Sequence, residues 1–190
     1  MQPEISQFLS GMKKAIEQVV IANLTDRFAQ EQAGMIAGTL GFLQTVQDKA
    51  FHYELLENHL YKQLLSDAVA IVTRDATASK VTAEGVAAIR AHQEVDPAGS
   101  AVHLKPFRFL RGSNETMREL LATLIHAQDQ FPAAVSTRFE ALLRPFFKDL
   151  QIRERAWVKA LGFDNLTDPV PDLDALLYRD GQLHLPGLGG

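Results

Sequence analysis

The chain has 190 residues and a mass of 21.0 kDa, which suits a single domain large enough to bury a sizeable core. It contains no cysteine, and this excludes disulfide bonds, thiolate zinc sites, iron–sulfur ligation and cysteine nucleophiles. The net charge of -4 lies in residues 160–190, because residues 1–159 hold 18 acids and 18 bases. A neutral body with an acidic end is a poor general binder of nucleic acid.

The N-terminal sequence and the longest apolar window indicate the location of the protein in the cell. The N-terminus shows no basic stretch followed by an apolar core, so we expect no secretory signal. The most apolar window, 33–46, is about 14 residues long, whereas a helix that spans a bilayer needs about 20. We therefore expect a soluble, cytoplasmic protein.

The first half of the chain predicts long helices, because residues 4–96 contain no proline and proline breaks helix interiors. Apolar residues at three- and four-residue steps predict an amphipathic helix that starts after Pro3, and a second helical run follows it. Residues 23–26 predict the break between them, with Thr25 as the next N-cap. One helix of fifty residues would be about 75 Å long, so we expect another break near 47–50.

Shorter elements follow. Residues 75–80 are small and polar and predict a loop, and residues 81–94 predict a weak helix. Residues 96–100 combine proline, glycine and serine, a clear break. We expect an irregular connector over 103–111 and a helix whose N-cap is Ser113.

Proline and glycine mark the last elements. Pro132 opens the final long helical stretch, Pro145 is expected to kink it or split it in two, and Gly162 is placed as its C-cap. A short helix is expected over 172–179, and we expect 182–190 to be loose.

Together these elements predict an all-α fold, an antiparallel helical bundle of five to seven helices with an irregular C-terminal tail. We expect a single helical domain over 1–163. The acidic C-terminal extension, 164–190, is expected to contain one short helix.

Three glycines, Gly34, Gly38 and Gly41, are spaced to form one stripe without side chains on a helix. Each costs about 1 kcal/mol against alanine in a helix, so we expect a packing reason for them. The stripe predicts a close helix–helix crossing, inside the chain or across a homodimer. The alternative is the approach of a flat ligand such as haem.

Two histidines, His52 and His59, are seven residues apart and share a helix face. Two turns separate them by about 10.5 Å along the axis, too far for easy chelation of one metal from one helix. We expect partly buried histidines bonded to neighbours, no metal and no cofactor. A metal site at this pair is the alternative.

Cations and aromatics alternate in Lys105, Phe107, Arg108, Phe109 and Arg111, a region without acidic residues. Such a stretch can bind an anion or an acidic protein surface, and we take these five as the predicted partner-binding residues. In the simpler interpretation the two phenylalanines anchor a loop on the core while the cations stay solvated. A further hypothesis places the acidic extension over 103–111.

No motif in the chain names a reaction, and we assign no catalytic residue. We expect a non-enzymatic regulatory or adaptor protein that acts by protein–protein interaction, for example by sequestering a transcriptional regulator or an enzyme. Its partner would be another protein, and a homodimer is a further option. The alternative is a helical-bundle protein or enzyme that binds haem, a metal or a small apolar ligand between helices.

Overall fold

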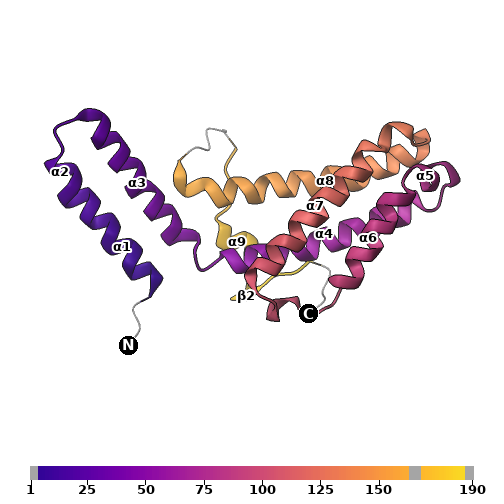
Figure 1. The fold of residues 1–190 in the computed structure, drawn as a ribbon, viewed down its shortest axis with the longest axis horizontal. Coiled ribbons are helices and arrows are strands. Elements are labelled where there is room, and N and C mark those ends of the chain that lie inside the picture. Colours follow the sequence, from indigo (N-terminus) through magenta and orange to yellow (C-terminus); the bar gives the residue numbers. More distant parts are fainter. Residues whose placement is uncertain (1–3, 163–167, 187–190) are drawn as a thin grey trace. The chain divides into compact units, whose positions relative to one another are not determined.

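The computed structural model describes residues 4–162 and 168–186, and these are almost entirely helical (Figure 1). The all-α prediction is confirmed. The chain divides into two compact units: the first unit comprises Met1–Ala50 and Ile152–Leu173, and the second unit comprises Phe51–Gln151 and Asp174–Gly190. A single domain over 1–163 and an antiparallel bundle of five to seven helices stay predictions, and the expected boundary at 163 and 164 lies outside the described residues.

The first unit begins with a helical hairpin whose two long helices lie side by side (Figure 1). Its elements are α1 (Ile5–Ala15), a π-helical turn (Ile16–Val20), α2 (Ile21–Asn23) and α3 (Arg27–Val46). The predicted break at 23–26 is confirmed, but Thr25 is not the cap. Asp26 occupies that position, because its carboxylate accepts a hydrogen bond from the backbone N–H of Ala29 at 2.7 Å.

Few side chains of the hairpin are buried. Leu9 is the buried residue of α1, and Ala33, Ala37 and Val46 are those of α3. Phe42 of α3 meets Trp157 edge to face, with ring centroids 6.4 Å apart. Because this buried set is small, most of the large apolar side chains of the hairpin are left at the surface.

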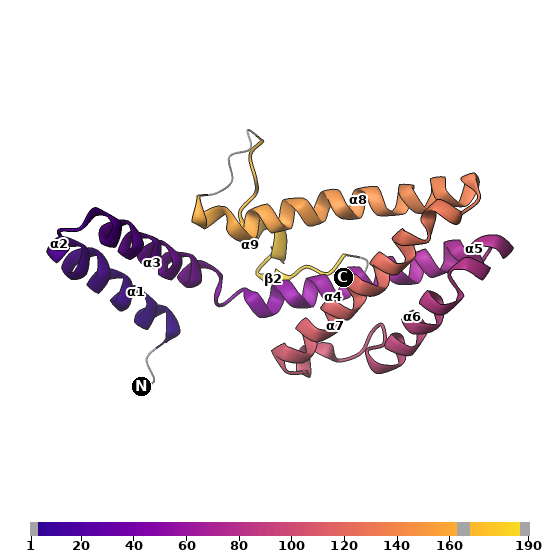
Figure 2. The same ribbon diagram turned by 45° about the horizontal axis from the view of Figure 1, so that its top comes forward.

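The second unit is built on α4, and α7 crosses it in both views (Figures 1 and 2). The remaining elements of the chain are α4 (Ala50–Val72), α5 (Ala76–Val81), α6 (Ala83–Val95), η2 (Val102–Leu104), α7 (Phe107–His126), η3 (Gln128–Gln130), α8 (Ala133–Val158), η4 (Lys159–Leu161), α9 (Leu173–Leu177), β1 (Tyr178–Arg179) and β2 (Gln182–Leu183). The expected break near 47–50 is confirmed, since α3 ends at Val46 and α4 begins at Ala50.

The core of the second unit collects apolar side chains of five helices, α4, α5, α6, α7 and α8. Its fully buried members include Leu65 of α4, Ile89 of α6, Leu124 of α7 and Phe139 of α8. Apolar area removed from water stabilises by about 25 cal/mol per Å², so helices with one apolar stripe are held together by covering one another.

Two local predictions are wrong at the start of helices. Residues 75–80 are not a loop, because the Asp75 carboxylate accepts hydrogen bonds from the N–H groups of Thr77 and Ala78 and thereby caps α5. The connector expected over 103–111 is a short 3-10 turn followed by α7, which starts directly after Pro106. Ser113 therefore lies inside α7 and is not its cap.

Proline does not divide the last long helix. α8 continues through Pro145, so a split of the helix is wrong, whereas a kink at this residue stays a prediction. Leu143 and Phe146 on either side of it pack into the core of the second unit, and this packing offsets the lost backbone hydrogen bond. Gly162 has a φ of 73°, the left-handed conformation expected of a residue that ends a helix.

The C-terminal segment has more structure than the sequence indicates. A short α9 leads into a hairpin in which Tyr178 pairs with Leu183, and its turn residues Asp180 and Gly181 both have positive φ. The expectation of a loose chain from 182 is thus wrong for Gln182 and Leu183, whereas 187–190 lie outside the described residues. In the described part of the chain, none of the helices has the length and apolarity needed to cross a bilayer.

Candidate functional site

A buried carboxylate joins several elements of the second unit. Asp96 follows the end of α6, and its Oδ1 accepts hydrogen bonds from Lys62 Nζ at 2.6 Å and Ser100 Oγ at 3.2 Å. Its Oδ2 accepts from Asn58 Nδ2 at 2.8 Å and Ser113 Oγ at 2.7 Å. The donors come from α4, α7 and the loop after α6, so one side chain ties all three together.

The charge of Asp96 is balanced inside this network. Burial alone would raise the pKa of Asp96, but hydrogen bonds from Lys62, Asn58 and Ser113 and the positive charge of Lys62 outweigh it. The pKa of Asp96 is therefore lowered, and the group is ionised at neutral pH. Because Lys62 is only 8% exposed and Asp96 1%, this is a buried ion pair whose two charges depend on each other.

His92 extends the network toward the surface. Its Nε2 lies 2.9 Å from Ser113 Oγ. Since that hydroxyl already donates to Asp96, we assign the proton of this contact to His92 Nε2. Burial lowers the pKa of His92. The negative charge of Asp96 raises this pKa and the positive charge of Lys62 lowers it, and the net result is a lowered pKa.

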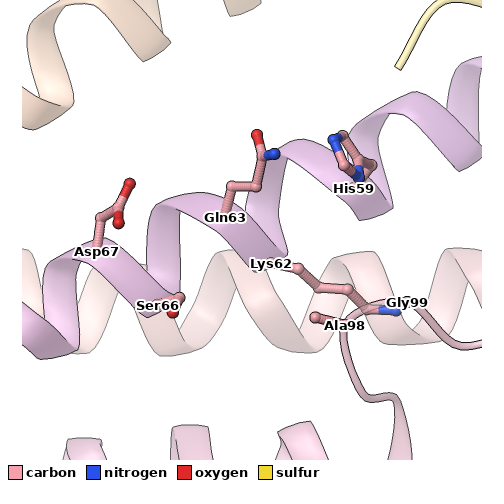
Figure 3. A pocket seen from close by; sticks show the side chains of 7 residues that line it. All are labelled: His59, Lys62, Gln63, Ser66, Asp67, Ala98 and Gly99. Atoms are coloured by element: carbon pink, nitrogen blue, oxygen red, sulfur yellow. The ribbon is translucent and has the colours of Figure 1, made fainter. Parts of the chain in front are cut away.

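Two pockets open beside the network and share His59, Lys62 and Gly99. The polar pocket has a volume of about 530 Å³ and is lined by His59, Lys62, Gln63, Ser66, Asp67, Ala98 and Gly99. In Figure 3 the Lys62 side chain extends from α4 to the loop that carries Ala98 and Gly99. The amphipathic pocket has a volume of about 400 Å³ and is lined by Leu55, Asn58, His59, Lys62, Gly99, Ser100, Val102, His103, Leu183 and Leu185.

The C-terminal segment forms one wall of the amphipathic pocket through Leu183 and Leu185. The carbonyl of Pro186 holds this segment against α4, because it lies 2.6 Å from His59 Nε2 and 3.1 Å from Gln63 Nε2. Val102 and His103 line the same pocket, so the segment lies beside the start of the 103–111 stretch. Coverage of the whole basic stretch by the extension stays a prediction.

The two predicted histidines both contact the C-terminal segment. His52 Nδ1 lies 2.8 Å from the hydroxyl of Tyr178, and the two rings meet edge to face. Among the described residues, no three histidine or carboxylate side chains are grouped so that they could hold a metal ion. The contacts of the two histidines thus hold the C-terminal segment against α4.

The predicted partner-binding residues lie at the start of α7. Lys105, Arg108 and Arg111 are exposed. Lys105 Nζ stands 5.5 Å from the centre of the Phe109 ring, and Phe107 lies against Phe51 with centroids 6.4 Å apart. The cations are accordingly at the surface and the aromatics face neighbours, and binding of a partner here stays a prediction.

The glycine stripe faces outward. Gly34 and Gly38 are exposed, and none of the described atoms would lie within 4 Å of a Cβ added at either position. At Gly41 an added Cβ would meet only the Lys13 side chain, at 3.5 Å. A close helix crossing at the stripe, inside the chain or across a homodimer, stays a prediction.

Sequence reasoning missed the network. Asn58 and Lys62 continue the buried face of α4 that carries Leu55 and Leu65, at steps of three and four residues. Two polar residues on an apolar stripe were the available signal, because a buried polar side chain needs a partner. Their partner Asp96 is more than thirty residues away, and no local pattern points to it.

Exposed apolar residues form a second feature, located in the first unit. Ile5 and Met12 are seven residues apart on α1, as are Phe28 and Met35 on α3, so each pair shares a helix face. The exposed set of the hairpin is Ile5, Phe8, Met12, Val19, Val20, Phe28, Met35, Ile36 and Leu43, with exposed fractions from 41% to 67%. Apolar surface of this extent is typical of interaction sites.

Comparison of the chain with protein-family models, with curated proteins and with solved structures found no match. The structure therefore defines the protein by class: an all-α protein with apolar helix faces exposed on its first unit. Its second unit holds a buried ion-pair network beside two pockets.

Proposed function

We propose that the protein is a non-enzymatic regulatory or adaptor protein that acts by protein–protein interaction through the helical hairpin of its first unit. The observation that supports this is the set of exposed apolar side chains on α1 and α3. Soluble chains rarely leave so many large apolar side chains in water without a use for them.

The exposed area is of the right size for an interface. Nine large side chains that are each about half exposed present roughly 900 Å² of apolar surface, close to the ~800 Å² that one partner contributes to a standard interface. Association costs translational, rotational and side-chain entropy, so only part of this area would appear as affinity.

The partner proposed for these faces is a second copy of the chain. Apolar residues seven apart suit packing against another helix. Residues 4–46 carry four acids and three bases, so two copies of the hairpin would meet little repulsion. A two-fold axis would place the same faces against each other.

A second contact is proposed for the basic stretch at the start of α7. It would bind an acidic surface of a target protein, such as a regulator or an enzyme to be sequestered. Its residues are Lys105, Phe107, Arg108, Phe109 and Arg111.

Light scattering on the full chain tests the dimer. We expect a mass of twice 21.0 kDa at micromolar concentration for the wild type. A variant that combines Ile5→Ser, Phe8→Ser and Met12→Ser is expected to give a mass of 21.0 kDa with an unchanged helical circular dichroism spectrum, since these side chains are already exposed.

The matched control replaces exposed polar residues on the same segment, with Gln7→Ser and Gln18→Ser, and should stay dimeric. A wild-type mass of 21.0 kDa at the highest concentration reached would refute the dimer. Equal dissociation of the control would show that the apolar faces are not responsible.

A further inference from the structure

The two helices of the hairpin meet along a line of small residues. Ala33 and Ala37 are buried on α3. One turn after Ala37, a Cβ added at Gly41 would meet the Lys13 side chain of α1 at 3.5 Å. Leu9, one turn before Lys13, is the buried residue of α1. These residues mark the faces with which α1 and α3 contact each other, and other positions can be placed relative to them.

One side of the hairpin is apolar on both helices. Met12 follows the buried Leu9 by three residues on α1, and Ile36 follows the buried Ala33 by three residues on α3. A step of three residues leads about 60° around the helix from the contact face. Because α1 and α3 run in opposite directions (Figure 1), equal steps on the two helices lead to the same side of the hairpin. Met12 and Ile36 therefore share one side.

This apolar side continues along both helices. Ile5 precedes Met12 by seven residues and Leu43 follows Ile36 by seven, so each pair lies on one helix face. Phe8, one turn from both Ile5 and Met12, borders the same side. All five side chains are exposed. Apolar residues at seven-residue spacing suit insertion between the side chains of an opposing helix.

The remaining surfaces of α3 point elsewhere. Gly34 and Gly38 each follow a buried alanine by one residue, and this step leads to the other side of the hairpin. Met35 follows Ala33 by two residues and thus lies about 160° from the contact face, and Phe28, seven residues before Met35, shares this outer edge. The exposed apolar residues of α3 therefore divide between the apolar side and the outer edge.

The apolar side has the extent of one half of a homodimer interface. Its five side chains together expose roughly 500 Å² of apolar surface. One partner contributes about 800 Å² to a standard interface, and about 65% of a homodimer interface is apolar, which is also roughly 500 Å². A hairpin with one apolar side is moreover half of a four-helix bundle, in which each helix turns one apolar stripe inward.

We propose that the dimer is a four-helix bundle, in which the apolar sides of two hairpins pack against each other about a two-fold axis. The inference rests on the dimer proposed above and identifies the surface that forms it. The interface consists of Ile5, Phe8, Met12, Ile36 and Leu43 from each copy. The outer edge of α3 and its glycine stripe stay outside this interface.

Two double variants on α3 test the choice of side. Ile36→Ser with Leu43→Ser removes two side chains of the apolar side, and Phe28→Ser with Met35→Ser makes the matched change on the outer edge. We expect the first to raise the dimer dissociation constant, from sedimentation equilibrium of the full chain, by about 100-fold or more, and the second by less than about three-fold. An unchanged helical circular dichroism spectrum shows that each variant is folded.

The outcomes separate this inference from the dimer itself. A wild-type mass of 21.0 kDa at the highest concentration reached would refute the dimer, and the four-helix bundle with it. A dimeric wild type whose dissociation constant is unaffected by Ile36→Ser with Leu43→Ser, or equally raised by both double variants, would refute the four-helix bundle and leave the dimer standing.

Thiol labelling provides a second test, because the chain has no cysteine of its own. Met35→Cys and Ile36→Cys place single thiols at neighbouring positions that are 58% and 53% exposed, on the outer edge and on the apolar side. We expect maleimide labelling of the Ile36→Cys variant to slow about ten-fold when the protein concentration rises from below to above the dissociation constant. Labelling of the Met35→Cys variant should keep its rate. Equal protection of both thiols, or protection of neither in a dimeric protein, would refute the proposed interface.

Discussion

At the scale of single residues, the second unit depends on one carboxylate. Asp96 accepts four hydrogen bonds, from Lys62, Ser100, Asn58 and Ser113. Removing one partner of a buried ion pair typically costs about 3–5 kcal/mol, because the remaining charge is left uncompensated. The network thus fixes the position of the C-terminal end of α6 relative to α4 and α7.

The lowered pKa values of His92 and Asp96 predict a loss of stability in acid. The folded protein holds His92 neutral at pH values where the unfolded chain, with a pKa of about 6.5, begins to bind a proton. The contribution of His92 to the free energy of unfolding is present above about pH 6.5, and it is lost as the pH falls through the folded pKa of His92. The contribution of Asp96 to the free energy of unfolding is present above its unfolded pKa and is lost at still lower pH. We expect the free energy of unfolding, from urea titrations, to fall between pH 7.5 and 5.5.

The variant His92→Gln separates this effect from that of the other histidines. Glutamine keeps an N–H for Ser113 but does not titrate, so the stability of the variant should fall less steeply over the same range. Asp96 and Lys62 are the charged groups that act on His92, and both remain in the variant. A slope identical to that of the wild type would mean that His92 does not carry the effect.

At the scale of elements, α3 carries glycines that its own unit does not need. A Cβ added at Gly34 or Gly38 would have no described atom within 4 Å, and neither position has a positive φ. Glycine in a helix costs about 1 kcal/mol against alanine. The glycines therefore weaken α3 without an internal packing gain.

We predict that Gly34→Ala and Gly38→Ala each raise the free energy of unfolding by up to about 1 kcal/mol, because alanine is the better helix former. Chemical denaturation at low protein concentration measures this. Gly85→Ala is the comparison, since its Cβ would lie 3.4 Å from Thr123 and 3.5 Å from Leu124 and should gain less. Destabilisation at Gly34 or Gly38 would contradict this prediction and would indicate that the added Cβ meets a close neighbour within the chain.

At the scale of the whole molecule, the end of the chain belongs to the fold. Leu177 of α9 is fully buried, and residues 174–186 belong to the second unit together with α4. Tyr178 and Pro186 are bonded to His52 and His59. Residues 174–186 of the acidic extension are therefore part of the packed second unit.

We predict that Leu177→Ala lowers the free energy of unfolding by about 2–5 kcal/mol, as expected for a leucine removed from a core. Leu104→Ala, at a position that is 76% exposed, should change it by less than about 0.5 kcal/mol. Thermal and urea denaturation of the full chain decide between these outcomes. A neutral Leu177→Ala would show that the C-terminal segment contributes little to the second unit.

The helices could be predicted from the sequence because their signals are local. Proline-free stretches, apolar steps of three and four residues and the breaks at 23–26, 47–50 and 96–100 each depend on neighbouring residues. The prediction failed at 75–80 and at Ser113. At 75–80 the small polar residues resemble a loop, but Asp75 caps a short helix there. At Ser113 the side chain resembles a local cap, but it donates to the distant Asp96.

The sequence by itself therefore determined the all-α class, most helix boundaries and the uneven placement of charge. Only the tertiary structure decided that Asn58, Lys62, Asp96 and Ser113 meet, that His52 and His59 bond to the chain end, and that the glycine stripe faces outward. The physical reason is separation along the chain. Local periodicity reports which face of a helix is apolar, but which elements cover that face depends on how the whole chain packs.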